Sequence, residues 1–586
     1  MRTAPIILLV CTVAFAGKEN LLANGGFEKG LDSWIFVDNS GNTEHSLDKQ
    51  VKKEGRQSLH LKKAGGPPFD VLRADVGALR EGSKVSVTAW FKAEKLQSNG
   101  GWFKIFFYDR SGEVIEQGND VKPLAGTYDW KEITIENRVP KKAASAAVFI
   151  LIVQPGELWT DDVRLTGAAG APAKEKPARK RPLDSGMRSW LDRNAIMVKT
   201  LDFDARHGDL ARLKPLLEGV RIVQLGEQSH MDGASFRAKA RLARFLHEEM
   251  GFEVIAFESG LFECEKANGL LAEGKGKAAM HASIFGIWRV EQVLPLFDHM
   301  AAAARSEHPL RLTGFDTRGS GAAADGFLAD LYAFLAPAAE VPAADREALA
   351  AIDAKLNASP YAPTGAEREA ASAALGRIRK LIDGNRAELV KAHGEPETEF
   401  FSRCVDNYGV REKFEFSMTG DDKELSGNLR DKQMAENLRW LAEVRYPDKK
   451  IITWAATAHQ AHNLKLVKIG GSSEQYEHWT NMGQYVHEWY GPKVFTIAFA
   501  ALEGRAGRFS PQFDIPEPKE DSFEDLLGRY GQPLVLVPLR GESAFQEAMF
   551  CSPMSYDRSI EAPWPQVVDA IFFTREMTAT KWVPAD

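Results

Sequence analysis

The sequence predicts a multidomain protein in which an N-terminal β-sandwich is followed by an α/β domain with a mostly parallel sheet and a helical lobe. At 586 residues, the chain exceeds the ~100–200 residues of an ordinary domain. Short strand-like runs fill residues 17–167, whereas strand-like and helix-like runs alternate over residues 184–586. Between them, residues 168–183 are rich in alanine, proline and lysine and have no apolar period, which is typical of a linker.

The composition indicates a globular protein whose partners are neither nucleic acids nor anionic membranes. Hydrophobic residues make up 44% of the chain and charged residues 26%, which allows sizeable cores. A formal net charge of −7 has the wrong sign for a protein that binds phosphate-rich polymers. Of the four cysteines, Cys11 falls in the leader described next, so the remaining three permit at most one internal disulfide.

Residues 1–16 are predicted to be a signal peptide. Arg2 precedes the apolar run Ile6–Phe15, and Ala14-Phe15-Ala16 is a typical cleavage pattern. The apolar run is shorter than the ~20 residues that span a membrane, and no later run reaches that length. We therefore expect a secreted or periplasmic protein without a transmembrane segment.

Alternating and aromatic runs predict the β-sandwich. Val85–Phe91 alternates, Trp102–Tyr108 is aromatic, and Val148–Val153 is apolar. Because successive side chains of a strand point to opposite faces, Trp102 and Phe103 should lie on different faces, and at least one aromatic set of this strand should belong to the core.

Several positions in this segment resemble jelly-roll carbohydrate-binding modules of the galactose-binding-like type. The resemblance rests on Asn24–Glu28, Trp34, Trp130 and Trp159–Leu165. It implies a jelly-roll fold, with a carbohydrate as the candidate ligand of this domain. Sandwiches of this kind also serve as adhesion or spacer domains, so the ligand is left open.

Strand ends in the second half predict one cleft. Strands are expected at Val220–Leu225, Glu253–Phe257, Arg311–Phe315, Lys450–Ala456, Val494–Phe499 and Leu534–Val537. Ligands of open α/β sheets bind beyond the carboxyl ends of the strands. Ionisable residues stand at or just past four of these ends, namely Glu227, Glu258, Asp316 and His459. Helices such as Asp345–Leu356, Glu367–Ile382 and Asn428–Val444 should form a lobe over the cleft and govern substrate selectivity.

The run Glu227-Gln228-Ser229-His230 joins a strand to a helix and suggests the chemistry. A carboxylate three residues from an imidazole is the minimum equipment for activating water by general base catalysis. No G-x-S-x-G motif accompanies Ser229, which disfavours a serine nucleophile. No H-E-x-x-H motif occurs, and His459-x-x-His462 alone is at most half of a metal site, so we expect no metal or other cofactor.

The second half of the chain resembles the erythromycin esterase family. The matching blocks follow one another in order over roughly residues 190–500: Gly226–His230, the helix Ser235–Glu249, Phe257-Glu258, Gly314–Asp316, Leu429–Asp431 with Met434, Trp454-Ala455 and Met482-Gly483. The resemblance implies a hydrolase that acts on ester bonds. It also implies catalytic roles for Glu227, His230, Glu258 and a later histidine.

The later histidine can be assigned in two ways. If the chain is aligned with the family block without gaps from Trp454 onward, His459 falls on the second histidine of the family. Ala456 then stands where the first histidine often is. Aligning His459-x-x-His462 with the paired histidines of the family makes both functional. We expect His459 to be catalytic first and His462 second.

Five further charged residues are candidates for binding substrate. They are Lys239, Arg241, Asp316, Arg318 and Arg430. Lys239 and Arg241 match basic positions of the family and could anchor a carboxylate or polarise a carbonyl. A salt bridge is an equally good interpretation of both.

Two functions follow from these patterns. The first is a secreted hydrolase of the erythromycin esterase type that cleaves an ester or lactone in a small molecule or a glycan-linked substrate. In it, His230 and a glutamate activate water. The alternative is a non-catalytic carbohydrate-binding envelope protein with a degenerate esterase cleft.

Overall fold

The computed structural model describes residues 20–37, 42–65, 69–77, 79–108, 114–118, 120–141, 143, 145–167, 182–230, 232–356, 361–419, 423–508, 510–542 and 544–585. The chain divides into two compact units, residues 1–109 with 114–174 and residues 110–113 with 175–586. The predicted signal peptide and residues 168–181 of the predicted linker lie outside the described residues. Both therefore stay predictions.

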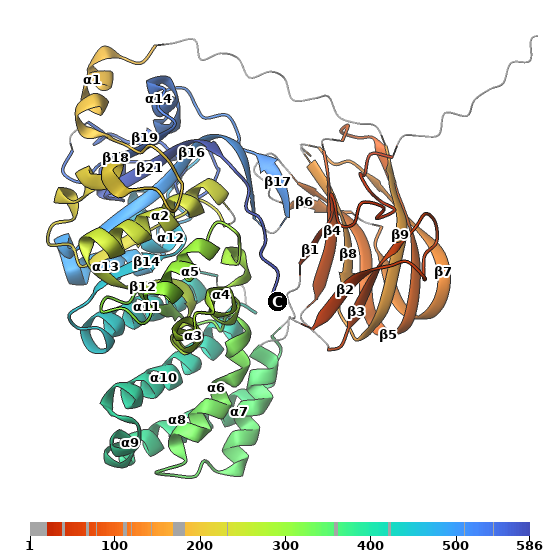
Figure 1. Cartoon of the computed structure of the whole chain (residues 1–586), viewed down its shortest axis with the longest axis horizontal. Coiled ribbons are helices and arrows are strands. Elements are labelled where there is room, and N and C mark those ends of the chain that lie inside the picture. The colour runs from red at the N-terminus through yellow and green to blue at the C-terminus, as the bar shows by residue number, and fades with distance from the viewer. Residues whose placement is uncertain are drawn as a thin grey trace, which may run out of the picture. The chain divides into compact units, whose positions relative to one another are not determined.

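Among its described residues, the N-terminal unit contains nine strands, drawn in red to orange in Figure 1. They are β1 (Ile35–Val37), β2 (Thr43–Asp48), β3 (Ser58–Lys63), β4 (Asp70–Val76), β5 (Lys84–Tyr108), β6 (Val114–Gln117), β7 (Lys122–Arg138), β8 (Ser145–Ile152) and β9 (Gly156–Thr166). Their order is β1-β4-β8-β5-β9-β3-β2, with β6 and β7 also paired to β5. Strand β5 pairs with β9 through its first half and with β8 through its second half. One long strand thus passes from one sheet of a β-sandwich to the other.

The core of the sandwich lies between the two halves of β5. Phe91 from the first half and Phe103 from the second are fully buried, and their rings meet edge to face at 5.1 Å. Phe107 belongs to the same core cluster, whereas Trp102 and Phe106 belong to a separate cluster on the other face of the strand. The predicted split of this strand's aromatic residues is confirmed, and the set with Phe103 is the core.

The second unit is built on an eight-stranded path in the order β10-β18-β21-β16-β11-β14-β12-β13. Its strands are β10 (Ile196–Met197), β11 (Ile222–Leu225), β12 (Phe252–Gly260), β13 (Arg311–Asp316), β14 (Lys450–Trp454), β16 (Val494–Arg508), β18 (Leu534–Pro538) and β21 (Ala570–Met577). Every neighbouring pair from β21 to β13 is parallel, but β18 is antiparallel to both of its neighbours. The sheet is therefore mixed, and the direction of β18 is a feature that local sequence patterning does not encode.

Shorter strands complete the unit. Strand β17 (Ser510–Asp514) pairs with β16, and a separate small sheet contains β15 (Lys468–Ile469), β20 (Ile560–Ala562) and β19 (Met549–Phe550). The sequence patterns did not indicate β10 or β21. The first has only two residues, and the second lies beyond the blocks that carry the family resemblance.

Helices cover both faces of the main sheet, so the unit has three layers. On one face, Val223 and Leu225 of β11 pack in a core cluster with α2 (Gly233–Met250) and α5 (Leu294–Ala303). On the other, Ile222 packs in a cluster with α6 (Phe327–Leu335), α10 (Glu395–Ser417), α11 (Lys423–Trp440) and α13 (Met482–Tyr490). Alternate side chains of one strand thus enter two different cores.

The predicted helical lobe is present as α6 to α11, drawn in green to teal in Figure 1. It also contains α7 (Ala343–Leu356), α8 (Gly365–Gly384) and α9 (Arg386–His393), and a π-helical turn at Leu441–Arg445 continues α11. The remaining helices are α1 (Ser185–Asn194), α3 (Leu261–Ala272), α4 (Gly276–Ser283), α12 (Thr457–Gln460) and α14 (Phe523–Tyr530). Within the described ranges, no helix has the length and apolarity needed to cross a membrane.

Candidate active site

Glu227 and His230 meet at the carboxyl end of β11. Glu227 is fully buried, and its Oε1 lies 2.7 Å from Nδ1 of His230. Its Oε2 accepts a hydrogen bond from Nζ of Lys239 at 2.6 Å, and the indole of Trp288 donates to Oε1 at 3.1 Å. Burial by itself raises the pKa of Glu227, but Lys239 and His230 outweigh burial and hold the pKa at about 2. The carboxylate is therefore ionised and fixed in place.

Gly226 allows the loop after β11 to approach the loop after β14. A Cβ atom at this position would lie 2.4 Å from Oγ1 of Thr457, so no side chain fits there. The backbone N–H of Thr457 donates to the carbonyl oxygen of Glu227 at 3.0 Å. These contacts bring together two loops that carry predicted site residues.

Glu258, Asp316 and Arg430 form a second, largely buried group. Nη2 of Arg430 donates to Oε1 of Glu258 at 2.7 Å and to Oδ2 of Asp316 at 2.6 Å. Oε2 of Glu258 accepts from the backbone N–H of Ala456 at 3.0 Å. Burial raises the pKa of Glu258, but His459 and Arg430 outweigh burial and hold the pKa at about 2. The ends of β12 and β13 and helix α11 therefore meet at one guanidinium.

His459 joins this group from helix α12. Its Nδ1 lies 2.8 Å from Oδ1 of Asp431, and its Nε2 lies 3.1 Å from Nη1 of Arg430 and 3.5 Å from Oε1 of Glu258. His459 and His230 both help to lower the pKa of Glu258. Asp431 was not among the residues predicted from the sequence to form the site. The one indication of Asp431 in the sequence was its position next to Arg430 in the block Leu429–Asp431, which matches the family.

The structure brings most of the predicted residues together. The cluster contains Glu227, His230, Lys239, Glu258, Asp316, Arg430 and His459. Lys239 contacts Glu227 rather than open cleft, and it is fully buried. Trp288, which the sequence analysis did not select, completes the surroundings of Glu227.

Three predicted residues lie outside this cluster. Arg241 makes a buried ion pair with Asp209, with Nη2 2.6 Å from Oδ1, so the salt-bridge interpretation of Arg241 is the one that the structure contains. His462 packs its ring against His487 at 4.0 Å, and burial lowers the pKa of His462. Arg318 is half exposed and pairs with Glu415 at 3.4 Å.

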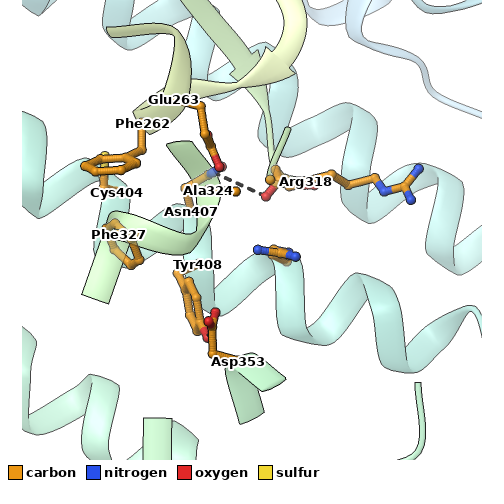
Figure 2. Close-up of a pocket in the computed structure, with 12 residues that line it drawn as sticks. Phe262, Glu263, Arg318, Ala324, Phe327, Asp353, Cys404, Asn407 and Tyr408 are labelled. Atoms are coloured by element: carbon orange, nitrogen blue, oxygen red, sulfur yellow. Dashed lines mark hydrogen bonds between the residues drawn. The ribbon is translucent and has the colours of Figure 1, made fainter. Parts of the chain in front are cut away.

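A small pocket lies between the loop after β13 and the helices α3, α6, α7 and α10 (Figure 2). Its volume is about 30 Å³, room for roughly two water molecules. Figure 2 shows Asn407 beside the loop after β13, where Nδ2 of Asn407 donates to the carbonyl oxygen of Thr317 at 3.5 Å. It also shows Tyr408 next to Asp353. Burial raises the pKa of Glu263, another lining residue, to about 7. The pocket is thus lined by the beginning of α3, which follows Glu258, and by the loop that follows Asp316.

Comparison with known proteins identifies the family. A sequence profile described as erythromycin esterase matches residues 247–575, more than half of the 586 residues. The chain belongs to the erythromycin esterase family. The match begins after Glu227 and His230, so the placement of these two residues in the site comes from the geometry described above.

The known proteins that resemble this chain are distant in sequence. YbfO of Bacillus subtilis (strain 168) is 28% identical over 378 residues, which cover 59% of this chain and 80% of YbfO. Erythromycin esterase type II of Escherichia coli is 20% identical over 373 residues, which cover 58% of this chain and 86% of that protein. A mutant of the erythromycin esterase EreC in its open conformation aligns with a TM-score of 0.53 and 19% identity, over 67% of this chain and all of EreC. The structural likeness establishes a shared fold.

Proposed function

We propose that this protein is an exported hydrolase, secreted or periplasmic, that cleaves an ester or lactone with water activated by His230. The observation that carries the proposal is the asymmetric surroundings of this imidazole. Nδ1 contacts the ionised Glu227, and among the described residues no side chain or backbone group makes a hydrogen bond with Nε2. The side chain is 19% exposed, so Nε2 has access to water. An imidazole oriented in this way is a general base.

The reaction follows from these contacts. Nε2 of His230 takes a proton from water while the water oxygen attacks the carbonyl carbon of the ester. The negative charge that develops on the carbonyl oxygen requires nearby positive charge, and Arg430 is the buried cation across the cluster. Breaking the bond to the alcohol oxygen releases an acid and an alcohol. Glu227 stabilises the imidazolium that forms meanwhile.

A serine nucleophile has little support. The hydroxyl of Ser229 donates to the carbonyl oxygen of its neighbour His230 at 3.2 Å, and its backbone N–H donates to Asp232. Neither contact places an imidazole nitrogen where it could take the hydroxyl proton. The hydrogen bonds of Ser229 therefore stabilise the conformation of the loop.

The N-terminal sandwich is proposed to tether the hydrolase to a glycan. This part of the proposal rests on the sequence resemblance to carbohydrate-binding modules. The alternative, a carbohydrate-binding envelope protein with a degenerate cleft, is disfavoured because buried charges cost free energy in a fold that has no use for them. Glu227, Glu258 and Asp316 are all buried carboxylates.

The test is a screen of the purified chain against ester and macrolactone libraries, followed by kinetics on a substrate that it identifies. His230→Ala should lower kcat by roughly 10²-fold or more, because general base catalysis contributes ~10²–10⁴-fold. Ser229→Ala is the matched control and should keep most of the activity. Prolonged treatment with a chelator should also leave the rate unchanged.

Full activity in a folded His230→Ala protein, checked by circular dichroism, would contradict the mechanism. A complete loss in Ser229→Ala alone would indicate an acyl-enzyme route instead. Activity that disappears on chelation and returns with zinc would indicate a metal mechanism. If His230→Ala and the unaltered chain both fail on every ester tested while glycan binding is measurable, the envelope alternative is favoured.

A further inference from the structure

Asp431 is a buried carboxylate that holds three donors behind His459. Its Oδ1 accepts from Nδ1 of His459 at 2.8 Å and from the backbone N–H of Met482 at 2.9 Å. Its Oδ2 accepts from the indole of Trp479 at 2.9 Å. The residue is fully buried. Water therefore cannot compete for the carboxylate, and the three donors fix its orientation.

These contacts determine which nitrogen of His459 carries the proton in the neutral ring. The indole and the backbone N–H can only donate, so the carboxylate of Asp431 acts as acceptor, and Nδ1 of His459 must carry a hydrogen. Nε2 is then the atom that gains and loses a proton. It accepts from Arg430 at 3.1 Å when the ring is neutral, and Oε1 of Glu258 at 3.5 Å can receive its hydrogen when the ring is charged.

The surrounding charges favour the protonated form of this ring. Burial by itself lowers the pKa of His459, but Asp431 and Glu258 outweigh burial and raise the pKa above its ordinary value. Arg430 opposes them to a smaller extent. His459 is thus the imidazole of the cluster that is equipped to donate a proton.

We propose that Asp431 is a positioning residue that fixes the Nδ1–H tautomer of His459 and thereby makes His459 the proton donor to the leaving alcohol. The proposal rests on the ester hydrolysis proposed above. As the bond between the carbonyl carbon and the alcohol oxygen breaks, its electron pair goes to the oxygen, and Nε2–H of His459 supplies the proton. The ring is then neutral and regains a proton from solvent.

This arrangement gives the helical lobe a part in catalysis. Asp431 and Arg430 are consecutive residues of α11, whereas Glu258 lies in β12, and His230 and His459 lie on the segments that follow β11 and β14. The proton donor is therefore complete only when α11 is docked on the sheet. From the sequence, the lobe was expected to govern substrate selectivity alone.

Nuclear magnetic resonance of the full chain labelled with ¹⁵N-histidine tests the tautomer without any substrate. In the unaltered protein, the His459 ring should keep Nδ1 protonated, and Nε2 should titrate. Asp431→Asn should shift the neutral ring toward the Nε2–H tautomer and lower the pKa of His459, because the negative acceptor is gone. Glu248→Gln is the matched control: it removes a carboxylate 2.9 Å from His207 and should leave the His459 signals unchanged.

Kinetics on a substrate from the screen test the role. Asp431→Asn should lower kcat by roughly 10²-fold, and the combined Asp431→Asn/His459→Ala variant should be no slower than His459→Ala alone, because the two residues act as one unit. Trp479→Phe, which leaves the pair intact, should retain the Nδ1–H tautomer and lose less activity. Losses that multiply in the combined variant would overturn the proposal, since Asp431 would then act independently of His459.

The two proposals can fail separately. A chain that hydrolyses no ester contradicts the proposed function but leaves the tautomer measurement valid. An active enzyme in which Nε2 carries the proton of neutral His459 contradicts the role of Asp431 alone. That result requires no variant, so it decides the question even if Asp431→Asn does not fold.

Discussion

His230 and His459 each contact a buried carboxylate through Nδ1, but their Nε2 atoms have different neighbours. Nε2 of His230 contacts no described hydrogen-bonding group, whereas Nε2 of His459 lies between Arg430 and Glu258. The first ring is therefore free to take a proton from water. The second lies among charges that favour its protonated form. Ester hydrolysis needs a base that takes a proton from the attacking water and an acid that gives a proton to the departing alcohol. Two imidazoles in different environments can divide these tasks.

Lys239 is predicted to support Glu227 rather than the substrate. Burial lowers the pKa of Lys239 to about 8, with Glu227 opposing this shift, so the ammonium is still charged at neutral pH. Removing one partner of a buried ion pair costs about 3–5 kcal/mol, because the other charge is left buried and unpaired. Lys239→Met should therefore lower the free energy of unfolding by about that amount in a urea titration.

Lys214→Met is the control for this variant. Lys214 pairs with Glu249 at a similar distance, 2.7 Å, but both side chains are more than 40% exposed. Exposed pairs contribute at most ~1 kcal/mol, so this variant should change stability little. Equal effects of the two substitutions would mean that the Lys239–Glu227 pair is not buried as described.

At the scale of elements, α11 is fixed to the sheet by Asn437. Nδ2 of Asn437 donates to the carbonyl oxygen of Phe315 at 2.9 Å and to Oδ1 of Asn407 at 2.8 Å. Its Oδ1 accepts from Nε of Arg403 at 2.8 Å. Asn437 lies two helical turns beyond Arg430 and connects α11 both to the end of β13 and to α10. The position of the catalytic part of α11 depends on these contacts.

Asn437→Ala should therefore weaken both the fold and the activity. Leaving buried donors and acceptors unpaired costs about 1–3 kcal/mol, measurable by urea unfolding. The value of kcat should fall as well, because Arg430 and Asp431 lie on the same helix. Asn428→Ala, at the partly exposed beginning of α11, removes two hydrogen bonds to the segment at 478–480 and should cost less than about 1 kcal/mol. A drop in stability without any change in kcat would contradict the positioning role of α11.

At the scale of the whole molecule, the chain consists of two compact units with separate cores. The sandwich core is formed within residues 22–165, and the two main cores of the second unit within residues 196–583. Because each unit has a hydrophobic core of its own, we expect each to be stable alone. Independent folding remains a prediction.

Cutting the chain near Pro177 should yield two soluble fragments that each unfold cooperatively. The fragment that begins near Leu183 should keep the hydrolytic activity, and glycan binding, if present, should stay with the N-terminal fragment. Circular dichroism and activity measurements on the separated fragments check this. A C-terminal fragment that unfolds while the whole chain stays folded would show that the units depend on each other.

The sequence by itself predicted most of the main strands of the second unit, but in the N-terminal unit its three strand runs correspond only to β5, which contains two of them, and β8. It could do so because alternation reveals strands, and because the carboxyl ends of parallel strands meet at one edge of a sheet. Glu227, Glu258, Asp316 and His459 were found by this reasoning, and the structure brings all four to the same edge.

Only the tertiary structure decided which of these residues act on one another. The contact of His459 with Asp431 joins residues 28 apart in sequence, and that of Arg430 with Glu258 joins residues 172 apart. It also placed Arg241 and His462 outside the cluster and made β18 antiparallel. Periodicity describes a single element and its buried face. Partners contributed by different elements, and the direction in which a strand joins a sheet, depend on how the elements pack together.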